Sequence, residues 1–326
     1  MASPGMVNDV KLGRRALPFL AAPALAQPGA PERAIRLVIP FTPGGSTDII
    51  GRIVAQRLGA LLGQTVVVEN RPGAGGTIGS DAVAKAPADG HTLLMGHIGT
   101  LAVNPGLYPR LPYDPLHAFA PICLVCTVAN CLAVTNSLAA RSLAEFLALA
   151  RADPGGIAYG SGGNGSATHI AVSALQEAAG VRFTHVPYRG TGPMMTDLIA
   201  GQLQMTMTGG PPALPPIRAG QLRALGVSSL RPVPAAPAIP AIADTVPGFE
   251  ALQWSGVVGP AGMPMAAVAR INAAIHTMLA EPQTRARLEP EAADPAPGTP
   301  EAFAALIAAE QARWGALIRR AGVRAE

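Results

Sequence analysis

The sequence is poor in lysine, in aromatic residues and in charge as a whole. Among its 326 residues only Lys11 and Lys85 are lysines, aromatic residues make up 4% and charged residues 13%. The net charge of +4 comes almost entirely from arginines that are scattered along the chain without a basic run. Because nucleic-acid binding needs a clustered basic face with aromatic side chains for stacking, this composition argues against a nucleic-acid partner.

Long hydrophobic runs are also missing after the N-terminal region, where no stretch stays apolar for the roughly 18 residues that span a bilayer. Near the N-terminus, Lys11, Arg14 and Arg15 precede an apolar run that ends with small residues at Ala26. This order is typical of a secretory signal peptide. We therefore expect residues 1–26 to be cleaved off after Ala26 and the mature protein to be periplasmic. The arginine pair leaves both the Sec and the twin-arginine route open.

Cysteine is scarce, with Cys123, Cys126 and Cys131 as the three thiols. A Cys-x-x-Cys pair invites a redox or zinc interpretation, but the run of residues 128–134 and the residues between the first two cysteines indicate a strand. Positions three apart on a strand point to opposite faces, and no second Cys or His pair completes a metal site. We expect buried, unbridged thiols and no metal.

The hydrophobic pattern predicts alternating strands and helices. An apolar run at residues 35–41 precedes a helical pattern with a 3.6-residue period through Leu62, and a similar order recurs at residues 66–83 and 156–179. This alternation indicates largely parallel sheets covered by helices. With 326 residues we expect two α/β lobes, residues 27–128 with 252–326 and residues 129–251. The chain would cross between them twice, which is the layout of a hinge.

Three loops that each lead into a predicted helix could bind an anion. Residues 41–48 contain the turn Gly44-Gly45, and Ser46 or Thr47 is expected to cap the following helix. Free N–H groups at a helix start bind anions, although the same pattern also fits a plain capped helix. Residues 161–169 and 188–191 form the other two loops, and together the three sets of donors suit a carboxylate.

Two enzyme classes remain as alternatives. The glycines of residues 70–79 partly match a dinucleotide fingerprint, but Ile78 stands at the third glycine position, so no cofactor is expected. A hydrolase would use Ser166 with His169 one turn later, yet the serines lack a Gly-x-Ser-x-Gly elbow. We expect no catalytic residue and no enzymatic activity.

Several segments together resemble one family. They are residues 41–48 (FTPGGSTD), 68–76 (VENRPGAGG), 111–115 (LPYDP), 186–193 (VPYRGTGP), 254–256 (WSG) and 260–262 (PAG). In this order they look like the signatures of the Bug family, the extracytoplasmic receptors of tripartite tricarboxylate transporters. The resemblance runs over nearly the whole mature chain. It implies an α/β fold of the type II periplasmic-binding-protein class, in which two lobes with two hinge crossings close on a ligand.

The resemblance also implies a set of ligand-binding residues. They are Phe41, Gly44, Gly45, Ser46, Thr47, Asp48, Gly75, Gly76, Ser161, Gly165, Ser166, His169, Tyr188, Gly190, Thr191 and Thr208. Family members often carry an aspartate where this chain has Thr208. Because a carboxylate is the natural partner of an ammonium group, its loss predicts a ligand without a free amine.

We therefore expect a monomeric solute-binding protein that captures a small non-amino carboxylate, either a mono-, di- or tricarboxylate or an aromatic acid. The resemblance implies delivery to the membrane permease subunits of a tripartite tricarboxylate transporter. Two other functions stay open at this point, a ligand-loaded receptor for a sensor kinase and an exported hydrolase. Which carboxylate is bound does not follow from the sequence.

Overall fold

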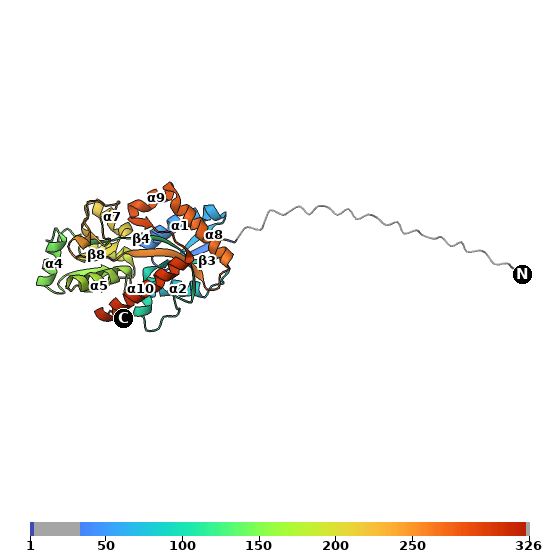
Figure 1. Cartoon of the computed structure of the whole chain (residues 1–326), viewed down its shortest axis with the longest axis horizontal. Coiled ribbons are helices and arrows are strands. Elements are labelled where there is room, and N and C mark those ends of the chain that lie inside the picture. The colour runs from blue at the N-terminus through green and yellow to red at the C-terminus, as the bar shows by residue number, and fades with distance from the viewer. Residues whose placement is uncertain (3–32, 324–326) are drawn as a thin grey trace. The chain divides into compact units, whose positions relative to one another are not determined.

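The computed structural model describes residues 1–2 and 33–323 (Figure 1). The predicted signal peptide and its cleavage point at Ala26 lie outside the described residues, apart from residues 1 and 2. From Arg33 onward the chain forms one compact unit with two β-sheets. The boundaries of the two predicted lobes remain a prediction.

The first sheet combines N-terminal strands with later ones that return to it. Its order is β11 (Ala293–Pro295), β4 (Phe119–Val128), β10 (Gln253–Pro260), β3 (Thr92–His97), β1 (Ile35–Ile39) and β2 (Val66–Asn70). β1 is parallel to β2 and β3, whereas β10 is antiparallel to β3 and β4. The expectation of a largely parallel sheet was therefore wrong here, because β10 enters the sheet on its return from the second one.

The second sheet is built from the middle of the chain. Its order is β7 (Thr184–Pro187), β6 (Ala158–Ser161), β8 (Met205–Gly209), β5 (Asn130–Thr135) and β9 (Leu222–Val227). β6 is parallel to β7 and β8, but β5 is antiparallel to β8 and β9. β5 is the first strand after the chain leaves the first sheet, so it too enters against the direction of its neighbours.

Helices connect the strands and pack on the sheets. They are α1 (Ser46–Leu62), α2 (Thr77–Ala84), α3 (Asn104–Leu107), α4 (Leu143–Ala152), α5 (Ala167–Ala179), α6 (Thr191–Ile199), α7 (Gly210–Arg218), α8 (Met265–Ala280), α9 (Pro282–Leu288) and α10 (Pro300–Ala321). α1 and α8 pack against each other beside the first sheet, and α5 packs on β8 of the second (Figure 1). None of the helices in the described part of the chain has the length and hydropathy to span a bilayer.

The helix α1 shows how the sequence pattern becomes structure. Its apolar residues Ile50, Val54 and Leu58 are buried together against the first sheet, as their spacing predicts. The helix ends at Gly63, which adopts the left-handed conformation (φ 67°) that glycine accepts without strain. The buried face and the C-terminal cap fix the position of α1, and the first residues of this helix lie at the candidate site.

The chain crosses between the sheets at two places. The first crossing is at Ala129, between β4 and β5, and the second runs from the end of β9 to Gln253. The expected continuous strand over residues 128–134 is therefore interrupted. The amide of Gly210 donates to the carbonyl of Ala129 (3.1 Å), and the amide of Asn130 donates to Ser228 Oγ (2.8 Å), so the chain changes partners at this point.

The three cysteines lie in the core close to the first crossing. Cys123, Cys126 and Cys131 are free and buried, which confirms the prediction of unbridged thiols. Burial raises the pKa of Cys126 and Cys131 to about 12, so both remain protonated at neutral pH. The described residues contain no group of three or more His, Cys, Asp or Glu placed to hold a metal ion.

Candidate functional site

The starts of three helices surround one small cavity. Its volume is ≈ 50 Å³. The lining residues are Phe41, Thr42, Gly45, Ser46, Thr47, His97, Gly162, Ser166, Ala167, Thr168, Gly190, Thr191, Thr208 and Gln253. α1 follows the first sheet, whereas α5 and α6 follow strands of the second, so the cavity lies between the two sheets.

At α1 the helix start leaves donors free. Gly45 is the N-cap in an extended conformation, and no side chain caps the helix. The amides of Asp48 and Ile49 both donate to the carbonyl of Gly45 (3.0 and 3.1 Å). The expectation that Ser46 or Thr47 caps the helix was therefore wrong, because both residues belong to its first turn. Their amide N–H groups have no helical acceptor and are available to a ligand.

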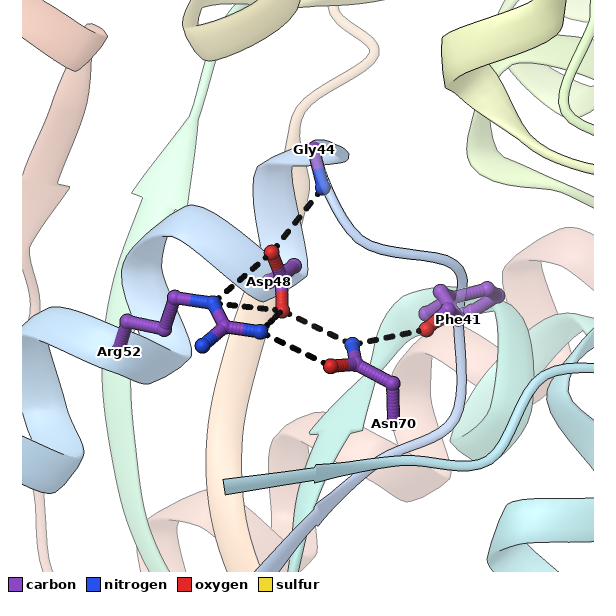
Figure 2. Close-up of polar contacts among 5 residues, drawn as sticks. All are labelled: Phe41, Gly44, Asp48, Arg52 and Asn70. Carbon is purple, nitrogen blue, oxygen red and sulfur yellow. Dashed lines mark hydrogen bonds and ion pairs between the residues drawn. The ribbon is translucent and has the colours of Figure 1, made fainter. Parts of the chain in front are cut away.

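A buried carboxylate behind this turn holds the loop in shape (Figure 2). Asp48 is 3% exposed and accepts hydrogen bonds from the amide of Gly44 (3.0 Å), from Arg52 Nε (3.1 Å) and from Asn70 Nδ2 (2.8 Å). Asn70 Nδ2 also donates to the carbonyl of Phe41 (3.1 Å). Burial raises the pKa of Asp48, but the hydrogen bonds from Arg52, Asn70 and Gly44 outweigh it and leave the pKa below its usual value. Asp48 therefore supports the loop, and its charged carboxylate does not line the cavity.

The helix starts in the second sheet offer the same kind of donor. Ser166 caps α5, and its Oγ accepts from the amide of His169 (3.3 Å). The amides of Ala167 and Thr168, both of which line the cavity, precede the first helical hydrogen bond and are free. At α6, Gly190 is the cap and Thr191 begins the helix without a side-chain cap. Partial positive charge from three helix dipoles thus meets at one place.

The loops of the two sheets touch each other around the cavity. A Cβ atom built on Gly190 would lie 2.2 Å from Thr42 Oγ1, and one built on Gly45 would lie 3.6 Å from Thr191 Oγ1. Gly190 has a φ of 138°, which side chains rarely adopt. The contact at Gly190 requires glycine because backbone and opposite loop meet with no room for a side chain, whereas the 3.6 Å at Gly45 is an ordinary contact.

The cavity carries no ionised side chain among the residues that line it. His97 is 4% exposed, and burial lowers its pKa to about 4, with the hydrogen bond to Gln253 opposing this shift. Its imidazole is therefore neutral at physiological pH. Hydroxyl groups of Thr42, Ser46 and Thr208 add neutral hydrogen-bonding groups to the free amides. Such a set of donors suits a small anion that brings its own negative charge.

The structure brings half of the expected site residues to this cavity. Those that line it are Phe41, Gly45, Ser46, Thr47, Ser166, Gly190, Thr191 and Thr208. Those that do not line it are Gly44, Asp48, Gly75, Gly76, Ser161, Gly165, His169 and Tyr188. Gly44 and Asp48 act within the loop, as described above.

A second, larger cavity adjoins the first one. Gly75, Gly76 and Tyr188 line it, its volume is ≈ 540 Å³, and it shares Phe41 and Gly190 with the smaller cavity. The hydroxyl of Tyr188 donates to Asp197 Oδ2 (2.7 Å), so this group is already engaged. These three residues therefore line the adjoining cavity and not the small one.

The remaining three expected residues, Ser161, Gly165 and His169, make hydrogen bonds that support the loop leading into α5. The amide of Gly165 donates to His169 Nδ1 (3.2 Å), and Ser161 Oγ lies 2.6 Å from His185 Nε2. The rings of His169 and His185 stack with their centroids 4.0 Å apart. The hydrolase alternative finds no support in these contacts, because the ring of His169 is bonded to Gly165 and only its backbone amide contacts Ser166 Oγ.

Six lining residues were not singled out from the sequence. Thr42, Gly162, Ala167 and Thr168 lie inside the loops that were expected to bind the ligand. His97 and Gln253 were missed altogether; they are the last residue of β3 and the first residue of β10, outside the glycine-rich loops. The signal that was available is the polarity of a histidine and a glutamine at the edges of apolar runs.

Acidification should destabilise the protein through its buried histidines. Burial lowers the pKa of His97 to about 4, and burial together with the neighbouring His185 lowers that of His169 to about 3. Because the unfolded histidines take up protons from about pH 6.5 downward and the folded ones do not, stability is lost as the pH falls below 6.5. Each of these two groups should cost about 1 kcal/mol between pH 7 and pH 5.5.

Urea unfolding of the wild type and of a His169→Gln variant at both pH values measures this effect. The glutamine variant should lose about 1 kcal/mol less on acidification, since glutamine does not titrate. An equal loss in both proteins would show that His169 takes up its proton over the same pH range in the folded and the unfolded state.

Comparison with known proteins shows which family the chain belongs to. The family model of the tripartite tricarboxylate transporter family receptor, TctC, matches residues 50–323. The chain belongs to this family. Protein BugT of Bordetella pertussis is 35% identical to this receptor over 312 residues, which cover 94% of this chain and 96% of BugT. The resemblance to the Bug family is therefore confirmed.

Solved structures extend the comparison to the fold. A protein of R. palustris with adipate is similar to this receptor with a TM-score of 0.87 and 36% identity, covering 90% of this chain and 98% of that protein. MatC of Rhodopseudomonas palustris with bound malate has a TM-score of 0.82 and 31% identity, covering 89% and 100%. The receptor thus has the predicted type II periplasmic-binding-protein fold.

Proposed function

We propose that this protein is a monomeric periplasmic solute-binding protein that captures a small carboxylate without a free amine. The convergence of three helix starts on a cavity without ionised side chains carries the proposal. A carboxylate placed there would accept from the free amides of Ser46, Thr47 and Thr168 without any desolvated counter-ion. The adipate and malate in the two related structures support this class of ligand.

Binding would work by closure of the two lobes, residues 27–128 with 252–326 and residues 129–251. Because the donors come from helices on both sheets, a ligand can engage all of them only in the closed arrangement. It would therefore shift the population toward that arrangement. The closed receptor would then deliver its ligand to the membrane subunits of a tripartite tricarboxylate transporter. We also propose export with cleavage after Ala26.

Thermal unfolding in the presence of carboxylates tests the proposal. Adipate, malate, citrate and benzoate are compared with alanine and glutamate and with an ester of each acid. A ligand present at about 100 times its Kd stabilises the folded state by about 2.7 kcal/mol, which should raise the melting temperature by about 5 °C. At least one of the non-amino acids should give such a rise, and the amino acids should give none.

Two outcomes would contradict the proposal. Stabilisation by amino acids alone would mean that Thr208 does not select against an ammonium group. Turnover of an ester, followed by release of the acid, would assign the protein to a hydrolase.

A further inference from the structure

A chain of buried hydrogen bonds connects the wall of the ligand cavity to both crossings between the lobes. His97 and Gln253 line the cavity, and Asn130 and Ser228 lie at the crossings. Their exposed fractions are 4%, 6%, 1% and 0% in that order. A polar chain at this depth is costly to break, because each group left without its partner keeps its full desolvation penalty.

The groups at the two ends of this series of hydrogen bonds decide which atom donates and which accepts in each of them. At one end the amide of Gly99 donates to His97 Nδ1 (3.0 Å), so the proton of the neutral ring lies on Nε2 and is donated to Gln253 Oε1 (3.2 Å). Gln253 Nε2 therefore faces Asn130 Oδ1 and donates to it. At the other end Asn130 Nδ2 donates to the carbonyl of Ala251.

The same carbonyl joins the two crossings. Ser228 Oγ donates to the carbonyl of Ala251 (2.8 Å) and accepts from the amide of Asn130 (2.8 Å), and the amide of Ser228 donates to the carbonyl of Asn130 (2.8 Å). Asn130 follows the first crossing, while Ser228 and Ala251 belong to the second. A rotation of one lobe against the other must therefore change the geometry around Asn130.

We infer that Gln253 is a positioning residue that couples the ligand cavity to the hinge and holds the lobes in the arrangement in which their loops touch around the cavity. Gln253 Oε1 accepts from His97 in the cavity wall, and Gln253 Nε2 donates to Asn130 at the hinge. No other single side chain in the described part of the chain joins His97 to Asn130. The importance of this role rests on the proposed binding function, but the role itself is a property of the ligand-free protein.

Interlobe distances measured without ligand test the inference. Spin labels are attached to cysteines introduced at Ala60 in α1 and Ala148 in α4, both exposed positions on opposite lobes, while the native thiols are buried. Gln253→Met keeps the length of the side chain but removes both hydrogen bonds. Its distance distribution should shift to longer values than that of the labelled wild type.

Gln204→Met is the matched control. Gln204 is half-buried directly before β8, and its Oε1 accepts from the amide of Ala158 (2.8 Å) within the second lobe. This variant also loses a glutamine hydrogen bond, but its distance distribution should equal that of the wild type. An unchanged distribution in Gln253→Met, or an equal shift in both variants, would overturn the inference.

A second variant decides the matter if Gln253→Met does not fold, as judged by circular dichroism. Asn130→Asp keeps the acceptor for Gln253 but turns a carboxylate oxygen toward the carbonyl of Ala251, so it should open the lobes in the same way. For any carboxylate that stabilises the wild type, the Kd should rise about tenfold in either variant, because the binding-competent fraction falls. If no carboxylate binds the wild type, the proposed function fails while the distance measurement still decides the role of Gln253.

Discussion

Replacing Gly190 with alanine should weaken carboxylate binding by about 100-fold or more, equivalent to about 2.7 kcal/mol. The added methyl group would lie 2.2 Å from Thr42 Oγ1 on the opposite loop, so the two lobes could not reach the arrangement in which both sets of amides face the cavity. The φ of 138° and ψ of 172° at this position add about 1–3 kcal/mol of backbone strain for any residue other than glycine. Calorimetric titration with the acid that stabilises the wild type most measures the loss.

Gly192→Ala is the control for this prediction. Gly192 lies two residues further on in the first turn of α6, and a Cβ built on it meets nothing within 4 Å. Its affinity should stay within about threefold of the wild type. The double variant Thr42→Gly with Gly190→Ala should regain part of the lost affinity, since the clash is removed and only the local strain remains. Binding by Gly190→Ala at wild-type strength would show that Gly190 and Thr42 separate when the ligand binds.

Placing an acid at position 208 should strongly weaken carboxylate binding. Thr208 is 2% exposed at the end of β8 and lines the cavity, which carries no ionised side chain. In Thr208→Asp a second negative charge about 5 Å from the ligand would cost about 3 kcal/mol at an effective dielectric constant of about 20. The new carboxylate would also occupy the positive end of the helix dipoles that attract the ligand. The Kd should therefore rise by about 100-fold or more.

Thr208→Asn separates charge from size. Asparagine has nearly the shape of aspartate without its charge, so this variant should bind within about tenfold of the wild type. Both variants are titrated with the same acid at pH 7.5, where the aspartate is ionised. A similar loss in both would mean that the size of the side chain rather than its charge limits binding at this position.

Much of the fold follows from local patterns in the sequence, and the exceptions have physical causes. α1 was predicted through its apolar period, and α5 through the strand and helix order of residues 156–179, because both signals are local in the sequence. α7 was missed because it contains Pro215 and Pro216 in its interior, where proline normally breaks a helix, while Pro211 and Pro212 stand in its first turn, where proline is tolerated. Packing of Ala213 and Leu214 in the core compensates for the lost hydrogen bonds.

The candidate site likewise has parts that the sequence predicts and parts that it does not. The loops around Gly45 and Gly190 could be predicted, since a glycine-rich turn before a helix is a local signal. His97 and Gln253 could not, because they become neighbours only through the antiparallel pairing of β10 with β3, which places Ser255 opposite His97. The break between β4 and β5 likewise depends on the distant residues Gly210 and Ser228.

The carboxylate donors of this site belong to the main chain, at the starts of α1, α5 and α6. No exchange of one amino acid for another removes an amide N–H, except an exchange for proline. Point mutations that add no charge therefore alter the walls of the cavity, such as Thr208, while the amide donors for the carboxylate persist. A protein built in this way can change its cargo during evolution through single exchanges of neutral wall residues, as long as they bring neither a negative charge into the cavity nor a side chain into the contact between Gly190 and Thr42.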